Sequence, residues 1–223
     1  MQEEAYKSRS QIALSYDANW LDLPSSNDPN AITRGASYVR GFIPDDTDPY
    51  IRMGIEGRLV RTLGDYDRTL ISSRASFDYV APLSSGSDLT QSQRLFDPTI
   101  RVRGFEDGGM APIDGDGSLV GGDVAFGATA QVQYHLVQNE TFPVYASLFM
   151  DMGTVFDRGR NYTANISGVQ TDFYDSSSLR ISTGLGFSLE TPAGVLTLTY
   201  AVPQFMEDFD REERVQFSLG SSL

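Results

Sequence analysis

Few residues of this chain are of the kinds that perform chemistry, and their spacing excludes the common catalytic and metal sites. The chain has no cysteine, which removes thiol nucleophiles, thiolate metal ligands and disulfides. His135 is the only histidine, so a paired-histidine zinc motif is impossible, and no nucleophile motif lies near it. Lys7, the only lysine, has no glycines before it, which excludes a phosphate-binding Walker loop. We therefore expect a protein that is not an enzyme and uses no cofactor.

Asp114 and Asp116, each followed by a glycine, are a weak calcium signal. The segment lacks a third carboxylate and the bidentate glutamate of an EF-hand loop, because position 125 is Ala125. Asp-Gly pairs are also frequent in tight turns, where aspartate accepts backbone hydrogen bonds. We predict a turn here and no metal ion.

Charge and hydropathy narrow the class of protein further. The 223 residues include 30 acidic and 17 basic ones, and the net charge of −13 argues against a nucleic-acid partner. No stretch approaches the roughly 20 apolar residues of a membrane helix, so a membrane role requires a closed β-barrel. The first residues lack the basic and apolar regions of a signal peptide. We expect either an internal segment of a longer protein or an organelle protein without a secretory leader.

Alternation of apolar and polar residues with period two dominates the chain. From Val124 to Leu136, every second residue is apolar and the residues between are small or polar. Segments of about ten such residues, separated by turn-rich loops, are typical of transmembrane barrels. The expected fold is all-β and antiparallel, with about nine strands at residues 9–20, 32–42, 50–63, 69–80, 124–136, 142–156, 179–190, 195–202 and 214–223. A further short strand leading into Arg103 is left open.

The charged residues of the predicted strands fall on one face. Arg52, Glu56 and Arg58 lie opposite the apolar residues of their strand, and Arg74 and Asp78 do so in the next one. An arginine that faces lipid at mid-bilayer costs roughly 2 to 4 kcal/mol, so a barrel requires this sorting. A soluble β-sandwich alternates in the same way with its polar face outside, and periodicity alone does not separate the two folds.

A motif in the longest loop, together with elements after it, resembles the BamA-type barrel assembly superfamily. This superfamily includes TamA, the two-partner secretion transporters and the mitochondrial sorting-and-assembly barrel. The chain carries what looks like the family's signature tetrapeptide, Val102-Arg103-Gly104-Phe105. Further along, it carries a segment similar to the family's Phe-x-Asp-x-Gly element, Phe149-Met150-Asp151-Met152-Gly153. The order and spacing match over nearly the whole chain, from about residue 8 onward.

The resemblance implies the C-terminal part of a larger barrel across residues 1–223, with a loop at residues 84–120 inserted in the lumen. It also implies that Arg103 meets Asp151 on the inner wall, and the strand pattern is compatible because it places Asp151 on the non-apolar face. We call the predicted cluster the loop lock; its members are Arg103, Gly104, Phe105, Phe149, Asp151 and Gly153. A guanidinium-carboxylate contact is directional and contributes about 1.5 to 3 kcal/mol. The alternative is an ordinary loop arginine and a hydrated lumenal aspartate.

Two other arginines are candidates for the role of Arg103. Arg40 lies in a second Val-Arg-Gly-Phe sequence, but inside a predicted strand and without the later elements, so we interpret it as a coincidence. Arg101 has the same strand phase as Arg103, although the Gly-Phe that follows favours Arg103.

The function that the resemblance implies is insertion and folding of client barrel proteins by strand exchange at a lateral seam. One side of the seam would be the last strand, with Val215, Phe217 and Gly220, and the glycine would weaken its pairing. The implied partners are the lipid bilayer, unfolded client barrels and accessory subunits of an assembly complex. The implied location is an outer membrane, the mitochondrial one slightly favoured over the Gram-negative bacterial one. The alternatives are a secretion or translocation channel of the same superfamily, or a soluble β-sandwich binding module.

Overall fold

A computed structural model of the chain describes residues 11–16, 33–35, 37–42, 50–62, 68–83, 88–137, 142–158, 163–166, 169–191 and 194–220. The six long strands are β4 (Tyr50–Thr62), β5 (Thr69–Pro82), β8 (Val124–Val137), β9 (Val144–Phe156), β12 (Arg180–Thr191) and β13 (Gly194–Phe205). The shorter strands are β1 (Gln11–Tyr16), β2 (Thr33–Gly35), β3 (Ser37–Phe42), β6 (Gly104–Phe105), β7 (Ile113–Asp114), β10 (Thr163–Ile166), β11 (Val169–Tyr174), β14 (Glu212–Glu213) and β15 (Val215–Gly220). One 3-10 turn, η1 (Gln91–Gln93), lies between β5 and β8. No helix in this part of the chain has the length and hydropathy needed to cross a membrane.

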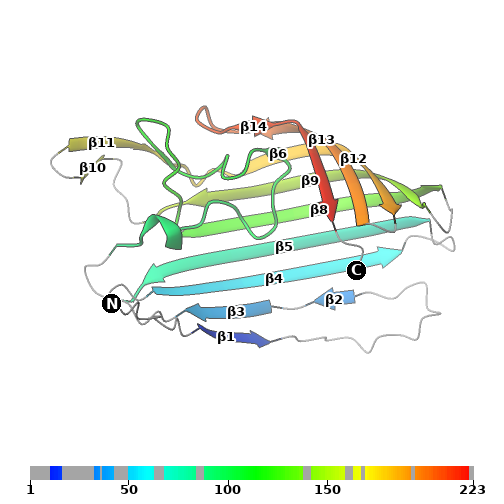
Figure 1. The fold of residues 1–223 in the computed structure, drawn as a ribbon, viewed down its shortest axis with the longest axis horizontal. Helices are drawn as coiled ribbons and strands as arrows, with labels where there is room; N and C mark the ends of the chain where they lie inside the picture. The colour runs from blue at the N-terminus through cyan, green and yellow to red at the C-terminus, as the bar shows by residue number, and fades with distance from the viewer. Residues whose placement is uncertain are drawn as a thin grey trace, which may run out of the picture.

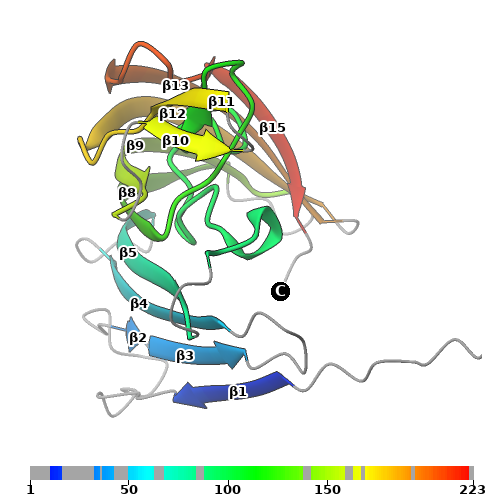
Figure 2. The ribbon, with the colours of Figure 1, turned by 90° about the vertical axis from the view of Figure 1, so that its left-hand side faces the viewer.

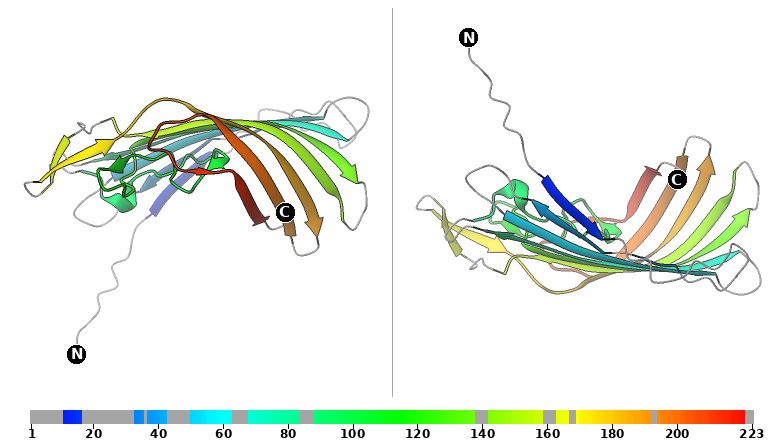
Figure 3. Two further views of the ribbon diagram at one scale, coloured as in Figure 1. Left: turned by 90° about the horizontal axis from the view of Figure 1, so that it is seen from above. Right: turned by 90° about the horizontal axis from the view of Figure 1, so that it is seen from below.

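Eight strands form one antiparallel sheet in the order β15-β13-β12-β9-β8-β5-β4-β2. The order of the strands in the sheet follows their order in the chain, and three of the seven neighbouring pairs, β4–β5, β8–β9 and β12–β13, are consecutive strands with short connections. In Figure 1, β3 continues the line of β2 beside β4, and β1 pairs with β3 on the outside. The sheet is strongly curved, as Figure 3 shows from above and below. Within the described residues, the end strands β1 and β15 do not pair with each other, so one edge of β15 is free.

Large apolar side chains cover the convex face of the sheet. Ile55, Leu148 and Phe217 are 57%, 60% and 70% exposed. Leu148 lies in register between Val132 and Leu185, which are also exposed, so the apolar positions form continuous rows across the strands. A soluble sandwich buries its apolar face and exposes its polar one, whereas this sheet does the reverse. The arrangement is that of a barrel wall that faces hydrocarbon.

The connection from β5 to β8 lies against the concave face (Figure 2). Its residues bond to polar side chains of the wall: Thr99 donates from its backbone N–H and its hydroxyl to Asp78, and Ile100 N–H donates to Ser76. A small apolar core lies between this connection and the wall and consists of Val80, Leu89, Leu95, Ala111, Ala125 and Val155. The polar inner wall and the connection therefore satisfy each other's hydrogen bonds.

The all-β antiparallel prediction is confirmed, with several differences in detail, among them the short strands β6, β7 and β14 outside the predicted segments. Each of the nine predicted segments contains a strand, but residues 32–42 hold two, β2 and β3, which pair with different partners. The predicted loop at 157–178 holds a hairpin, β10–β11, and β11 also pairs with β7. Strand β13 continues to Phe205, past Pro203, which pairs beside the register shift at Ser182, where a residue without an N–H is tolerated.

Candidate functional site

Arg103 and Asp151 are in direct contact on the concave face. Asp151 belongs to β9, and Arg103 immediately precedes β6 at the tip of the β5–β8 connection. The guanidinium donates from Nε to Oδ2 at 2.7 Å and from Nη2 to Oδ1 at 2.8 Å, and the backbone N–H of Arg103 also donates to Oδ2 at 3.0 Å. The contact is bidentate, the geometry that only arginine provides.

Further polar groups complete the contact. Arg103 Nη1 donates to Gln131 Oε1 and Nη2 to Thr129 Oγ1, both at 3.0 Å. The Thr129 hydroxyl donates to Asp151 Oδ1, so each carboxylate oxygen accepts two hydrogen bonds. The Ser182 hydroxyl donates to the carbonyl oxygen of Arg103, and the guanidinium carbon lies 3.4 Å from the centre of the Phe149 ring. The cluster thus draws on β8, β9 and β12.

Because the pair is largely buried, these hydrogen bonds contribute to the stability of the folded chain. The Asp151 side chain is 0% exposed and that of Arg103 is 22% exposed. A buried carboxylate is tolerated only when it is paired and its lone pairs are satisfied, as here. Removing one partner of such a pair costs about 3 to 5 kcal/mol, because the other charge stays buried without compensation.

Gly104 and Gly153 are required by the backbone geometry of the site. Gly104 has a φ of +97°, which residues with a side chain rarely adopt. At Gly153, an added Cβ would lie 2.6 Å from the carbonyl oxygen of Phe126 and 2.6 Å from Val102 Cγ2. The absence of a side chain at 153 is therefore what lets the tip lie directly on the wall.

Phe105 anchors the tip on the side away from Asp151. Its side chain is 1% exposed and packs with Val102 and Met110 in a small core of its own. Its carbonyl oxygen accepts a 2.9 Å hydrogen bond from Gln216 Nε2 on β15. All six residues predicted for the loop lock therefore lie around one point of the concave face, and Phe105 also contacts the last strand.

The chain as a whole matches a known protein family. A family model described as the Omp85 superfamily domain covers residues 2–223. The chain belongs to the Omp85 superfamily. Among solved structures, the crystal structure of BamA from Haemophilus ducreyi lacking POTRA domains 1–3 is similar, with a TM-score of 0.70 and 20% sequence identity. The match covers 91% of this chain and 41% of that chain, so the present Omp85 chain spans less than half of the matched one. At this identity the likeness concerns the fold.

The other two arginines of the sequence analysis do not share the site. Arg101 pairs with Asp107 at 2.5 Å and donates to the Phe105 carbonyl oxygen at 3.2 Å, whereas the carboxylate of Asp151 is bonded to Arg103. Arg40 lies within β3, as predicted, and its side chain is outside the described residues. In this Omp85 chain the residue that reaches Asp151 is Arg103.

The predicted seam residues lie on the last strand. Val215 is in register with Tyr200, Phe217 with Leu198 and Gly220 with Val195 of β13. Val215 and Phe217 are 59% and 70% exposed on the convex face. A Cβ added at Gly220 would meet nothing within 4 Å, so its space alone does not demand glycine. That Gly220 weakens the pairing of the last strand stays a prediction.

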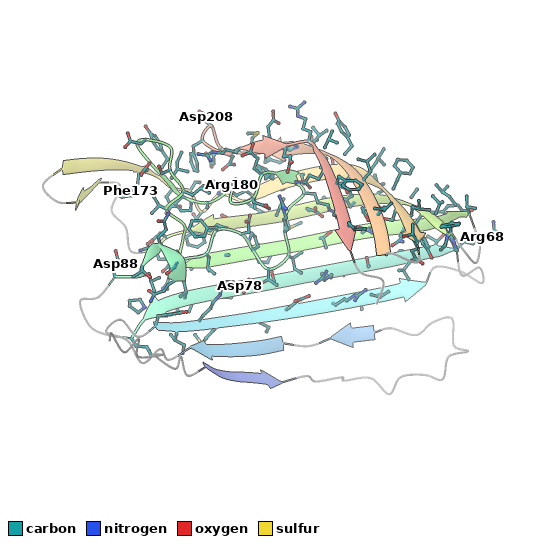
Figure 4. The ribbon with its side chains drawn as sticks, viewed as in Figure 1. Arg68, Asp78, Asp88, Phe173, Arg180 and Asp208 are labelled. Carbon is teal, nitrogen blue, oxygen red and sulfur yellow. The ribbon has the colours of Figure 1, made fainter. Side chains whose placement is uncertain are left out.

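Two arginines outside the loop lock, Arg94 and Arg180, are buried, and the sequence singles out neither of them. Arg180 of β12 is 1% exposed and pairs with Asp210, whose side chain is 0% exposed. Figure 4 labels Arg180 beside the segment that carries β14. Arg180 lies on the polar face of its strand like several other residues, and Asp210 lies in a loop with four other acidic residues, Glu207, Asp208, Glu212 and Glu213. Nothing in the sequence distinguishes Asp210 from these neighbours.

Two other predicted features have simple structural roles. Asp114 Oδ1 accepts hydrogen bonds from the backbone of Asp116 and Ser118, and Gly117 has a φ of +80°, which confirms the predicted turn. His135 stacks on Tyr145 with ring centroids 4.4 Å apart on the inner side of the strands. No group of three or more possible metal ligands occurs within the described residues.

One carboxyl group at the base of the tip has a perturbed pKa. Burial raises the pKa of Asp97 above its ordinary value of 3.8, and the neighbouring charge of Asp107 adds to the rise. The hydrogen bond from the Gly108 N–H, at 2.8 Å, and the charge of Arg101 act in the opposite direction and are weaker than burial. Ionised Asp97 is therefore a cost to the folded tip.

Proposed function

We propose that this chain is the barrel region of an outer-membrane assembly factor that inserts and folds client barrel proteins by strand exchange at the seam beside β15. In the same proposal, residues 1–223 are the C-terminal part of a larger barrel and the connection at 84–120 occupies its lumen. Family membership supports a role in barrel assembly or translocation. The observation that supports the finer proposal is that, within the described residues, β15 pairs with β13 alone, so its other edge would lie at the seam of the larger barrel.

A free strand edge exposes N–H and C=O groups that can pair with another strand. Strand β15 has only six residues, and its outward side chains are apolar and exposed, so an incoming strand would gain hydrogen bonds and lipid contact together. No covalent step and no nucleotide are needed, because hydrogen-bond replacement and apolar burial supply the driving force. The loop lock would hold the tip beside this edge.

The proposed partners are the lipid bilayer, unfolded client barrels and accessory subunits of an assembly complex. The structure of Haemophilus ducreyi BamA is that of a bacterial protein, which favours a bacterial outer membrane. The mitochondrial membrane, slightly favoured by the sequence, has no support from the comparisons.

The test is assembly of a client barrel in liposomes that contain the full chain or its Arg103→Ala variant. The proposal predicts faster client assembly with the parent chain than with empty liposomes, and loss of most of this gain in the variant. The matched control is Arg101→Ala, because Arg101 is on the same tip but is 41% exposed and does not contact Asp151. A variant that assembles clients as fast as the parent contradicts the proposed role of the lock. Conductance and export of one dedicated partner, without client assembly, would instead identify a translocation channel.

A further inference from the structure

The segment between β13 and β15 is held by a buried ion pair that the loop lock does not include. Arg180 donates from Nε to Asp210 Oδ2 and from Nη2 to Oδ1, both at 2.9 Å. Its third nitrogen, Nη1, donates to the carbonyl oxygens of Ser176 and Ser178 at 2.7 and 3.0 Å. The guanidinium carbon also lies 5.5 Å from the centre of the Phe209 ring. A guanidinium with this many partners fixes both its own position and that of Asp210.

The same segment is joined to the tip of the β5–β8 connection. The N–H of Glu106 donates to the carbonyl oxygen of Arg211 at 3.0 Å, and the N–H of Arg211 donates to that of Gly109 at 2.9 Å. Beyond these bonds, β14 pairs with β6 in antiparallel register. The tip is thus attached by backbone hydrogen bonds to residues that directly precede the last strand.

Very little chain separates these attachments from the free edge. Strand β14 ends at Glu213 and β15 begins at Val215, so one residue lies between them. Gln216, the second residue of β15, donates from its side chain to the Phe105 carbonyl oxygen. The tip therefore cannot leave Asp151 as a unit without moving the start of β15 or breaking its hydrogen bonds to β14 and Gln216.

We propose that Arg180 and Asp210 are positioning residues for strand exchange. They hold the segment at residues 210–214 in place. This segment connects the tip, which is bound to the wall by Arg103 and Asp151, to the start of β15. Only the role in strand exchange rests on the proposed function. The coupling itself is a property of the free protein. Two arginine–carboxylate pairs, one on β9 and one on β12, joined by the β6–β14 ladder, then add to the β13 ladder in holding the start of the seam strand.

The coupling is tested by hydrogen exchange of backbone amides in residues 215–220, with the full chain in detergent or lipid nanodiscs and no client present. Asp210→Asn weakens the bond to Arg180, and Arg103→Lys weakens the bond to Asp151. Each change is expected to speed exchange in 215–220 about tenfold, because either one releases the same segment. In the double variant the effects should be less than additive, since both residues act through one element.

Two controls separate positioning from general loss of structure. Arg158→Ala removes a half-exposed arginine that pairs with the mostly buried Asp123 away from the tip, and it should leave exchange in 215–220 unchanged. Gln216→Ala removes one half-buried hydrogen bond without exposing a charge, so it is expected to fold even if Asp210→Asn does not. It should speed exchange at 215–217 by a few fold.

The proposal is overturned if Asp210→Asn speeds exchange in its own loop but leaves exchange in 215–220 at the parent value. Where Asp210→Asn does not fold, the proposal is overturned if Gln216→Ala leaves exchange at 215–217 at the parent value. It is equally overturned if Arg103→Lys affects only residues 88–123. Because no client takes part, these results are independent of the assembly assay. Coupling without client assembly would count against the proposed function alone.

Discussion

Arg103 donates three of the four hydrogen bonds to the fully buried carboxylate of Asp151. The aspartate side chain is fully buried, and its four hydrogen bonds come from the guanidinium, the Arg103 backbone and Thr129. Lysine would supply the charge but not the planar fork, so charge and geometry can be separated by one substitution. The planar fork of the guanidinium, and not its charge alone, therefore keeps the tip on the wall.

Arg103→Lys is expected to lower the free energy of unfolding by about 1.5 to 3 kcal/mol, the difference between a bidentate charged contact and a single one. Urea unfolding in detergent, followed by circular dichroism, measures the change. Arg101→Lys serves as the matched control, and we expect it to alter stability by less than about 0.5 kcal/mol because its ion pairs are exposed. Equal effects of the two substitutions would show that the fork geometry is unimportant.

Gly153→Ala tests the close approach of the tip to the wall. The new methyl group would lie 2.6 Å from a backbone carbonyl oxygen, which cannot move as the end of a flexible side chain does. Overpacking of this kind costs about 1 to 3 kcal/mol, measurable in the same titration. Gly220→Ala is the control, since its Cβ would meet nothing within 4 Å. If both alanines are tolerated alike, the tip does not lie where the structure places it.

The long strands can be predicted from the sequence, whereas the pairings between very short strands cannot. Alternation over about ten residues gives a strong signal, and Val124 to Leu136 was predicted to within one residue of β8. The family motif located Arg103 and Asp151, which lie 48 residues apart. Strands β6 and β14 have two residues each, too few for any periodic pattern, and Asp210 is one of several acidic residues in its loop. Such pairings depend on the folded position of the two loops, which no local pattern encodes.

The base of the tip should respond to pH through Asp97. Its pKa is raised in the folded state, so the folded form binds the proton more tightly than the unfolded one and is stabilised as pH falls. Conversely, stability is lost as pH rises from the ordinary value of 3.8 through the raised pKa. Asp97→Asn should remove this loss while keeping an acceptor for the Gly108 N–H. Unfolding titrations of both proteins from the ordinary pKa of 3.8 upward in pH test this; an unchanged pH dependence in the variant contradicts it.

At the scale of the whole molecule, the curved sheet separates two environments. Its convex face carries exposed apolar rows, and its concave face carries the polar wall with the connection packed on it. Two neighbouring residues of β8 lie on opposite faces of the sheet: Val132 is 41% exposed on the convex face, and Gln133 lies on the concave one. A barrel wall predicts that the two positions tolerate charge very differently.

Val132→Arg is expected to lower the stability of the chain in lipid vesicles by about 2 to 4 kcal/mol, because it places a guanidinium in hydrocarbon. Gln133→Arg should cost little, since its side chain would face water and polar groups. Folding yield and urea stability in vesicles measure both. Should Gln133→Arg prove the more harmful, the assignment of the two faces would be reversed.

In the proposed function, the unpaired edge of β15 forms hydrogen bonds with an incoming client strand. Because the chain has no cysteine, a single cysteine at Ser218 offers one disulfide partner to a series of clients with single cysteines along their last strand. During assembly in liposomes, the account predicts cross-links at alternate client positions, as expected for two paired strands, and their loss in Arg103→Ala. Efficient client assembly with no cross-link to β15 at any position would contradict it.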